Sequence, residues 1–167
     1  DDFTLTVALP WLAETFPKEI AFGPDAANVA LWSNRSGREL DFRAKTLVEL
    51  AEISAFCYRD FDTYDEAAAK KHLRPAAREP FERMRAALEM LALEDWEPET
   101  LHHAVERVAA ELEVNMGKVA QPLRVAVVGR AASPGIDVTL QLVGKEAALR
   151  RIDKALAFIA EREAAAS

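Results

Sequence analysis

Residues 98–112, PETLHHAVERVAAEL, carry the clearest helical pattern of the chain. Pro98 opens the segment, a position in the first turn of a helix where the missing N–H of proline costs no hydrogen bond. Four apolar residues then recur every three or four positions, so they share one face of a helix: Leu101, Val105, Val108 and Leu112. The segment therefore predicts an amphipathic helix from Pro98 to about Leu112.

Segments on both sides of this helix repeat the pattern. We expect a helix with a wide apolar face over residues 42–61, and another over about 64–73 that Asp62 or Thr63 caps. Pro75 starts a further helix, and Pro80 either lies in its early part or restarts it. The apolar stripe of that helix is Phe81, Met84, Leu88 and Leu91, and that of a last helix over 145–163 is Leu149, Ile152, Leu156 and Ile159.

Glycine and proline divide the C-terminal part of the chain. We read residues 115–117 as a break, with Gly117 in a loop or helix end, and expect Pro122 in the first turn of a segment that runs from 118 to about 129. Residues 138–143 form a short helix or strand that Gly144 ends. The pattern predicts an all-α, two-lobed helical bundle with an uncertain N-terminal segment over 1–40 and subdomains over 41–116 and 117–167.

The composition agrees with a helical protein. Half of the 167 residues are apolar, and six are glycine. No apolar run is long enough to cross a bilayer, no secretory signal opens the chain, and the single Cys57 has no partner for a disulfide. We expect a cytoplasmic protein, and because the first residue is Asp, a fragment or a chain with a missing start.

The charge of the chain is unevenly distributed. The formal net charge is −7, which argues mildly against nucleic-acid binding. Between residues 117 and 154, however, seven basic and three acidic side chains give a local charge of +4. This C-terminal part is the one that we expect to face an anion, whereas the acidic residues over 60–113 repel one.

Arg124 stands in an otherwise apolar run, nine residues before the turn that begins at Ser133. An arginine there must reach water, a carboxylate or a ligand, because an unpaired buried charge is costly. A guanidinium suits phosphates and base edges, and the turn offers a hydroxyl, exposed backbone groups and an apolar prong at Ile136. From the residues alone, a structural Arg–Glu bridge beside an ordinary turn explains this pattern better than RNA binding does.

Few other residues suggest chemistry. His102 and His103 are adjacent, so they point about 100° apart on a helix and are expected to face solvent rather than share a metal. Cys57 lies among apolar residues and is expected in the core. The carboxylates near the start of the second predicted helix are read as solvated faces and caps rather than as a metal cluster: Asp60, Asp62, Asp65 and Glu66.

Three stretches resemble the C-terminal region of bacterial glutamyl-tRNA synthetases, which are class I aminoacyl-tRNA synthetases. They are residues 43–51, RAKTLVELA, then 117–126, GKVAQPLRVA, and then 133–136, SPGI, followed by 142–146, LVGKE. The second stretch is the most specific. The similarity covers about residues 41–160, and residues 1–40 match poorly.

The resemblance implies a helical cage of two subdomains that holds the anticodon loop of glutamate tRNA. By similarity, Arg124 and the turn at Ser133, Pro134 and Ile136 contact anticodon bases. The family often has Thr at the position of Ser133, so the hydroxyl is kept. The full set of candidate tRNA-binding residues is Arg43, Lys45, Lys118, Arg124, Ser133, Pro134, Gly135 and Ile136.

The resemblance also implies partners and cofactors. The parent ligase joins glutamate to its tRNA in protein biosynthesis, using ATP and magnesium bound by an N-terminal catalytic domain whose signature motifs do not occur here. We expect no catalytic residue or metal site in this chain, no membrane partner and a monomer. Two alternatives stay open: a helical protein-interaction module with an exposed apolar groove and no RNA binding, and a small hydrolase that uses Cys57 or His102.

Overall fold

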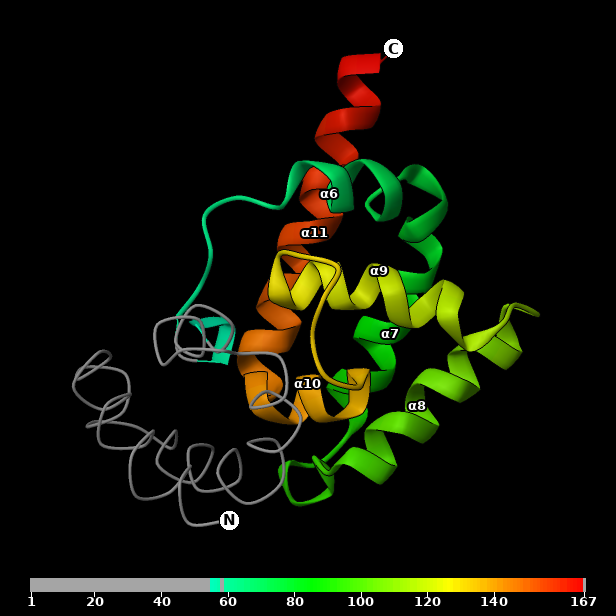
Figure 1. The fold of residues 1–167 in the computed structure, drawn as a ribbon. Helices are drawn as coiled ribbons and strands as arrows, with labels where there is room; N and C mark the ends of the chain where they lie inside the picture. The colour runs from blue at the N-terminus through cyan, green and yellow to red at the C-terminus, as the bar shows by residue number, and fades with distance from the viewer. Residues whose placement is uncertain (1–54, 58, 167) are drawn as a thin grey trace, which may run out of the picture. The chain divides into compact units, whose positions relative to one another are not determined.

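The computed structural model describes residues 55–57 and 59–166 (Figure 1). The chain divides into two compact units, residues 1–60 and 61–167. Of the first unit the structure describes a short 3-10 helix, η3 (Ala55–Cys57), and Arg59 and Asp60. The predictions for residues 1–40, for most of the helix over 42–61 and for Arg43 and Lys45 therefore lie outside the described residues.

The second unit is built from α-helices, with no strand among its described residues, so the all-α prediction is confirmed. Two short 3-10 helices, η4 (Pro75–Ala77) and η5 (Leu93–Asp95), join the longer helices. The α-helices are α6 (Glu66–His72), α7 (Arg78–Met90), α8 (Pro98–Glu111), α9 (Met116–Val128), α10 (Ile136–Val143) and α11 (Lys145–Ala166).

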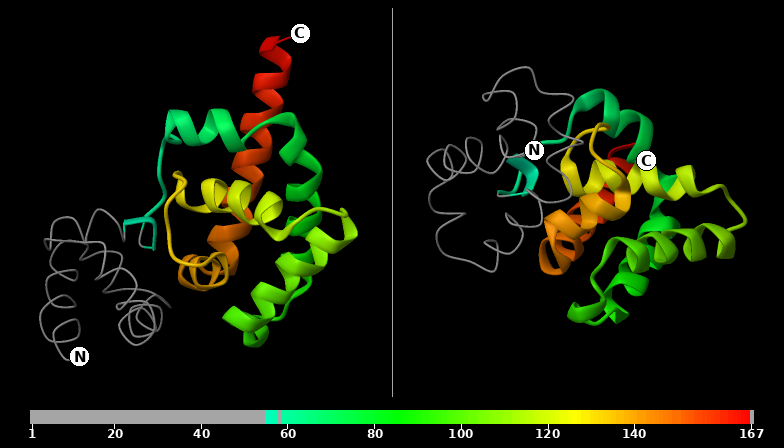
Figure 2. Two further views of the ribbon diagram at one scale, coloured as in Figure 1. Left: turned by 45° about the vertical axis from the view of Figure 1, so that its right-hand side comes forward. Right: turned by 60° about the horizontal axis from the view of Figure 1, so that its bottom comes forward.

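The middle of this unit is α9, which packs against each of the other described α-helices (Figure 2). Its sequence explains this position, because a helix that is apolar nearly all round must be covered on all sides. Only five of its residues are not buried: Met116, Gly117, Lys118, Gln121 and Arg124. The polar residues among these five lie on the side of α9 that the neighbouring helices leave open.

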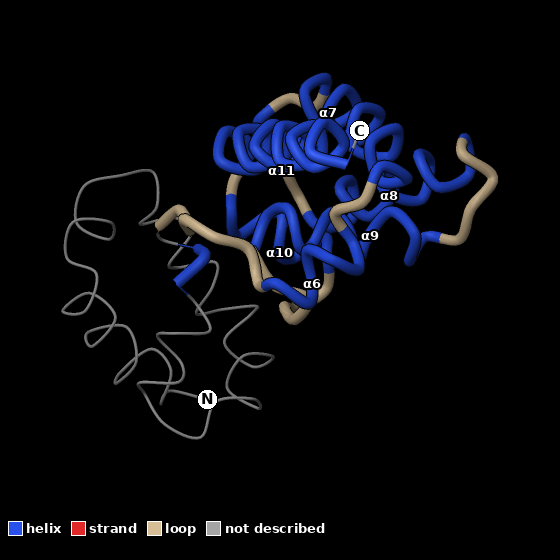
Figure 3. Tube along the Cα trace, turned by 90° about the horizontal axis from the view of Figure 1, so that it is seen from above, coloured by secondary structure: helices blue, strands red, loops and turns tan. Residues whose placement is uncertain are grey.

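The amphipathic helices surround α9 with the faces that the sequence predicts. The view from above shows α7 and α11 side by side, and α8 packs on both α7 and α10 (Figure 3). Phe81, Met84 and Leu88 of α7 are completely or almost completely buried. Trp96, in the turn before α8, donates a hydrogen bond from its indole N–H to the carbonyl of Leu140 at 3.0 Å, which ties this turn to α10.

Two helices begin at residues other than those expected. Asp65 caps α6, not Asp62 or Thr63, because its carboxylate accepts a hydrogen bond from the backbone N–H of Ala68 at 2.8 Å. Asn115 in the same way accepts from the N–H of Lys118 at 3.1 Å and starts α9 at Met116. Of the two roles predicted for Gly117, a loop or a helix end, the structure shows the second, since Gly117 is the second residue of α9. The break over 115–117 is wrong for Met116 and Gly117, and Pro122 lies inside the helix instead of in its first turn.

Gly144 separates the last two helices, α10 and α11. The segment over 138–143, left open between helix and strand, is the helix α10, and Gly144 ends it with φ 82°. On α11, Ile152 and Ile159 are fully buried, whereas Leu149 and Leu156 are half-buried beside the buried Ala148 and Ala155. The predicted subdomain boundary at 116/117 lies within the second compact unit, where α8 and α9 pack together.

Candidate nucleic-acid interface

Arg124 and the turn after α9 are held together by hydrogen bonds. Gly129 ends α9 in the left-handed conformation, with φ 83°, and turns the chain back toward the helix. The Nε of Arg124 then donates to the Oγ of Ser133 at 2.8 Å, and one Nη donates to the carbonyl of Pro134 at 3.2 Å. The sequence therefore brings Arg124 and the turn together as expected, although nine residues separate them.

A buried threonine completes this polar cluster. The hydroxyl of Thr139 lies 2.9 Å from that of Ser133 and donates to the carbonyl of Pro134 at 3.2 Å. Thr139 has no exposed surface, so its hydroxyl needs these partners. Sequence reasoning missed Thr139. The signal that could have identified it is its position at the start of α10, three residues after Ile136.

The turn exposes its backbone more than its side chains. Gly135 is exposed, Ser133 and Arg124 are half-buried, and Pro134 is buried. Ile136 is 4% exposed, because it is the first residue of α10 and points into the protein. The expectation of an exposed apolar prong at Ile136 is therefore not met by this structure.

Lys118 and Arg124 are both accessible on α9. Lys118 is exposed, and Gln121, which follows it by three residues, is half-buried. Residues three apart are neighbours on a helix surface, so Lys118, Gln121 and Arg124 form a stripe. Over its length the stripe winds by about 120° around the helix, so Lys118 lies beside the surface of Arg124 rather than on it.

Other basic residues of the C-terminal part have structural roles. Arg151 is buried, donates to the carbonyl of Val127 at 2.7 Å and lies 5.5 Å from the centre of the Phe61 ring. Lys145 and Lys154 donate to backbone carbonyls. The positive charge counted over residues 117–154 is therefore only partly available to a ligand.

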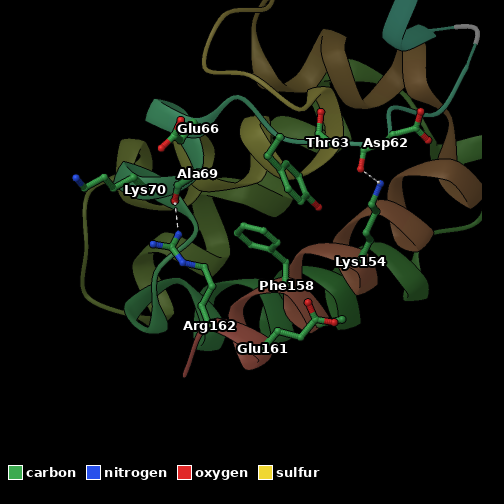
Figure 4. A pocket seen from close by; sticks show the side chains of 11 residues that line it. Asp62, Thr63, Glu66, Ala69, Lys70, Lys154, Phe158, Glu161 and Arg162 are labelled. Carbon is green, nitrogen blue, oxygen red and sulfur yellow. Dashed lines mark hydrogen bonds between the residues drawn. The ribbon is translucent and has the colours of Figure 1, made fainter. Parts of the chain in front are cut away.

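A cavity of about 500 Å³ lies between the start of α6 and α11 (Figure 4). Two of the cations that line it also bind backbone carbonyls. Lys154 points to the carbonyl of Asp62, and Arg162 to that of Ala69, at 3.3 and 3.2 Å. Tyr64 also lines the cavity, and its hydroxyl is buried with no hydrogen-bond partner among the described residues. Burial raises the pKa of Tyr64 to about 12, although the charge of Arg151 lowers it.

The residues considered for catalysis do not assemble a site in the described part of the chain. His102 and His103 both face Glu106, at 3.5 and 3.1 Å, on the partly exposed side of α8. Cys57 is half-buried rather than a core residue. The described residues include no cluster of His, Cys, Asp and Glu that would hold a metal ion. None of the described helices has the length and apolar character of a membrane span.

Comparison with protein families gives one match that covers most of the chain. A family model described as "Anticodon binding domain" matches residues 8–156. The matched range includes α6 to α10, the turn after α9 and about half of α11. It thus contains every candidate tRNA-binding residue of the sequence analysis.

Two solved structures are similar in fold. A glutamate tRNA ligase from Elizabethkingia meningosepticum, solved in complex with its amino acid, superposes with a TM-score of 0.70 at 22% identity over 94% of this chain. A glutamate-tRNA synthetase from Elizabethkingia anophelis gives a TM-score of 0.63 at 22% identity over 93%. The chain spans about 30% of the length of either enzyme.

Proposed function

We propose, from the premise that this chain belongs to the anticodon-binding domain family, that it recognises the anticodon loop of a tRNA through Arg124 and the turn over 133–136. The observation that supports this most is the pair of hydrogen bonds from Arg124 to Ser133 and Pro134. They fix the plane of a half-buried guanidinium beside a turn in which Gly135 is exposed.

A guanidinium fixed in this way is suited to unpaired bases. Bases in single-stranded loops are recognised by stacking and by hydrogen bonds to their edges, and an arginine plane supplies both. Because the turn already holds the side chain, little conformational entropy is lost when a base binds. Gly135 exposes backbone groups next to Arg124, and Lys118 adds a positive charge on the same helix.

We further propose that the chain is the C-terminal part of a glutamate–tRNA ligase and that its tRNA is the glutamate tRNA. The resemblance of residues 117–126 and the likeness in fold to two such enzymes support this assignment. In the whole enzyme, an N-terminal catalytic domain would use ATP and magnesium to activate glutamate in the cytoplasm. Anticodon binding here would place the distant acceptor end in that domain.

The direct test is a titration of this chain with a fluorescent anticodon stem-loop of glutamate tRNA. The same stem with a scrambled loop serves as the control RNA, and Arg124→Ala as the variant. We expect tighter binding of the correct loop, and a loss of that preference in Arg124→Ala on the order of 1–3 kcal/mol. Equal affinity of the wild-type chain for both loops would disprove the proposal.

The main alternative is a helical protein-interaction module. Met90 and Leu93, at the end of α7 and in η5, are 85% and 75% exposed, and exposed apolar side chains of this size suit a protein contact. That module would bind neither stem-loop. The titration therefore separates the two functions in one measurement.

A further inference from the structure

A basic groove of about 470 Å³ lies between the start of α9 and the end of α6. Lys71 and Arg74, at and just after the end of α6, lie on one side, and Lys118 of α9 lies on the other. His72 also lines it. No Asp or Glu is among the described residues that line this groove, so its charge is entirely positive.

The three cations of the groove differ from most basic residues of the described chain. Arg78, Arg83 and Arg85 each form an ion pair with a carboxylate. Lys71, Arg74 and Lys118 form no side-chain hydrogen bond or ion pair with the residues that the structure describes. No carboxylate among the described residues therefore pairs directly with them.

The start of α9 adds to the positive potential. Asn115 caps this helix through the N–H of Lys118, and the backbone N–H groups of the first turn point out of the helix end. The aligned peptide dipoles place a partial positive charge there. At the end of α6, outside the groove, Arg162 donates to the carbonyls of Ala69 and Leu73 and so covers acceptors there.

The groove continues into the candidate nucleic-acid interface. Gln121 lines the groove and is also the middle residue of the stripe from Lys118 to Arg124. Lys118 and Arg124 are six positions apart, which is about 9 Å along the helix axis and about 120° around it. An RNA strand that passes around this part of α9 would contact both residues.

We propose that this groove binds backbone phosphates of the same RNA whose loop bases meet Arg124, with Lys71, Arg74 and Lys118 as the phosphate contacts. The inference rests on the proposed function for the identity of the RNA. No Phe, Tyr or Trp is among the described residues that line the groove, so it is not a stacking platform. Cations that no carboxylate pairs with neutralise phosphates and do not read sequence.

The experiment compares two neighbouring lysines on one helix. Lys70 and Lys71 are both exposed on α6, but Lys70 lines the other cavity, so Lys70→Gln is the matched control for Lys71→Gln. A double variant, Lys71→Gln with Arg74→Gln, removes both charges of that side. Because these side chains are exposed, we expect the folded state to be kept, and thermal unfolding of each variant checks this.

Binding of the stem-loop is measured from 50 to 300 mM salt with the correct and the scrambled loop. Each lost phosphate contact should reduce the slope of log K against log salt by about 0.7, which corresponds to about fivefold weaker binding at 0.1 M salt. We expect about fivefold for Lys71→Gln, up to about 25-fold for the double variant and little change for Lys70→Gln. The loss should be the same for both loops, because phosphates carry no sequence information.

The outcomes separate this inference from the proposed function. If the wild-type chain prefers the correct loop but the double variant keeps its affinity and salt slope, the groove proposal is wrong and the anticodon proposal stands. If the double variant weakens both RNAs but the wild type has no loop preference, the groove is a general RNA-phosphate site and the anticodon proposal fails. No binding of either RNA by the wild type would overturn both.

Discussion

The guanidinium of Arg124 and the hydroxyl of Ser133 lie 2.8 Å apart and connect α9 to the turn before α10. This bond orients the side chain that we propose to meet an anticodon base. A lysine at 124 would keep the charge but lose the planar, forked set of donors.

We therefore expect Arg124→Lys to weaken binding of the correct anticodon stem-loop by about 1–3 kcal/mol, and to bind the scrambled loop nearly as the wild type does. Fluorescence anisotropy at fixed salt measures both affinities. Arg107→Lys is the control, since Arg107 is exposed on α8 and its Glu111 partner is 4.0 Å away. Retention of the full loop preference by Arg124→Lys would show that charge alone suffices there.

The hydroxyls of Ser133 and Thr139 are expected to stabilise the turn together. Thr139→Val keeps the shape of a fully buried side chain but removes a hydroxyl that bonds to Ser133 and Pro134. We expect each of Ser133→Ala and Thr139→Val to lower the free energy of unfolding by about 1–2 kcal/mol. The double variant should lose less than the sum, by about 0.5 kcal/mol or more.

Urea denaturation of the four chains measures this coupling. Thr100→Val, at a half-buried position on α8, is the control and should change the free energy of unfolding little. Strict additivity of Ser133→Ala and Thr139→Val would contradict a shared cluster. Ser133→Thr should retain both the stability and the RNA affinity, because it keeps the hydroxyl.

Gly129 is expected to be indispensable to the turn. Its φ of 83° is unfavourable for other residues, and a Cβ built there would lie 3.0 Å from the ring of Phe61. Its carbonyl also accepts a hydrogen bond from the N–H of Asp65 at 2.8 Å. We expect Gly129→Ala to lower the free energy of unfolding by about 1–3 kcal/mol.

A second background separates the two causes of this loss. In Phe61→Leu the ring contact is relieved and the backbone strain stays, so Gly129→Ala should cost less there than in the wild type. Thermal or urea unfolding of all four chains gives the difference. An unchanged stability of Gly129→Ala would disprove the constraint.

How far the sequence predicted this fold depends on which forces act at each residue. The apolar periods of α7 and α8 predicted their buried faces, because burial of Phe81 or Leu101 follows from spacing alone. The starts of α6 and α9 were misplaced, since several residues near each start can cap a helix. The sequence does not show whether Asp62 or Asp65 caps α6. The structure does, because the carboxylate of Asp65 accepts from the N–H of Ala68.

The candidate site was predicted in part for similar reasons. The proximity of Arg124 and Ser133 was expected from the resemblance and is observed, and the anticodon-binding domain that the resemblance implied is confirmed by the family match. The groove was missed because Lys71 and Arg74 lie in an acidic part of the sequence. Net charge along the chain cannot show that other residues pair the nearby acids, or that Arg151 is buried.

The buried hydroxyl of Tyr64 should make the stability of the protein depend on pH in the alkaline range. Burial raises its pKa to about 12, so the folded protein keeps this proton at a pH where an unfolded tyrosine, with a pKa near 10, loses it. The stabilisation is complete below about pH 10 and is lost as the pH rises toward 12. We therefore expect the free energy of unfolding of the wild type to fall between pH 10 and 12 relative to that of Tyr64→Phe.

At pH 8 the two chains should be equally stable, or Tyr64→Phe slightly more stable, because the replaced hydroxyl has no hydrogen-bond partner among the described residues. Urea denaturation at pH 8 and pH 11 measures both effects. Tyr58 is the only other tyrosine and is present in both chains. Parallel pH curves for the two chains would contradict the raised pKa.

His72 lines the groove, so its pKa should change when a phosphate binds there. Burial lowers its pKa, and the charges of Lys71 and Arg74 lower it further. Together with Lys118 these are the charged groups that line the groove with it, and no carboxylate is among the described lining residues. A phosphate bound beside them would favour the protonated imidazole and raise the pKa of His72.

Binding would then take up a proton, so the affinity for the stem-loop should increase as the pH falls from about 7 to 6. Proton NMR titration of the imidazole, with and without saturating RNA, measures this pKa. We expect the pKa of His72 to rise in the complex. The same rise should be smaller in the Lys71→Gln, Arg74→Gln variant, because fewer cations would hold the phosphate near the imidazole. An unchanged or lowered pKa of His72 in the wild-type complex would place the phosphates elsewhere.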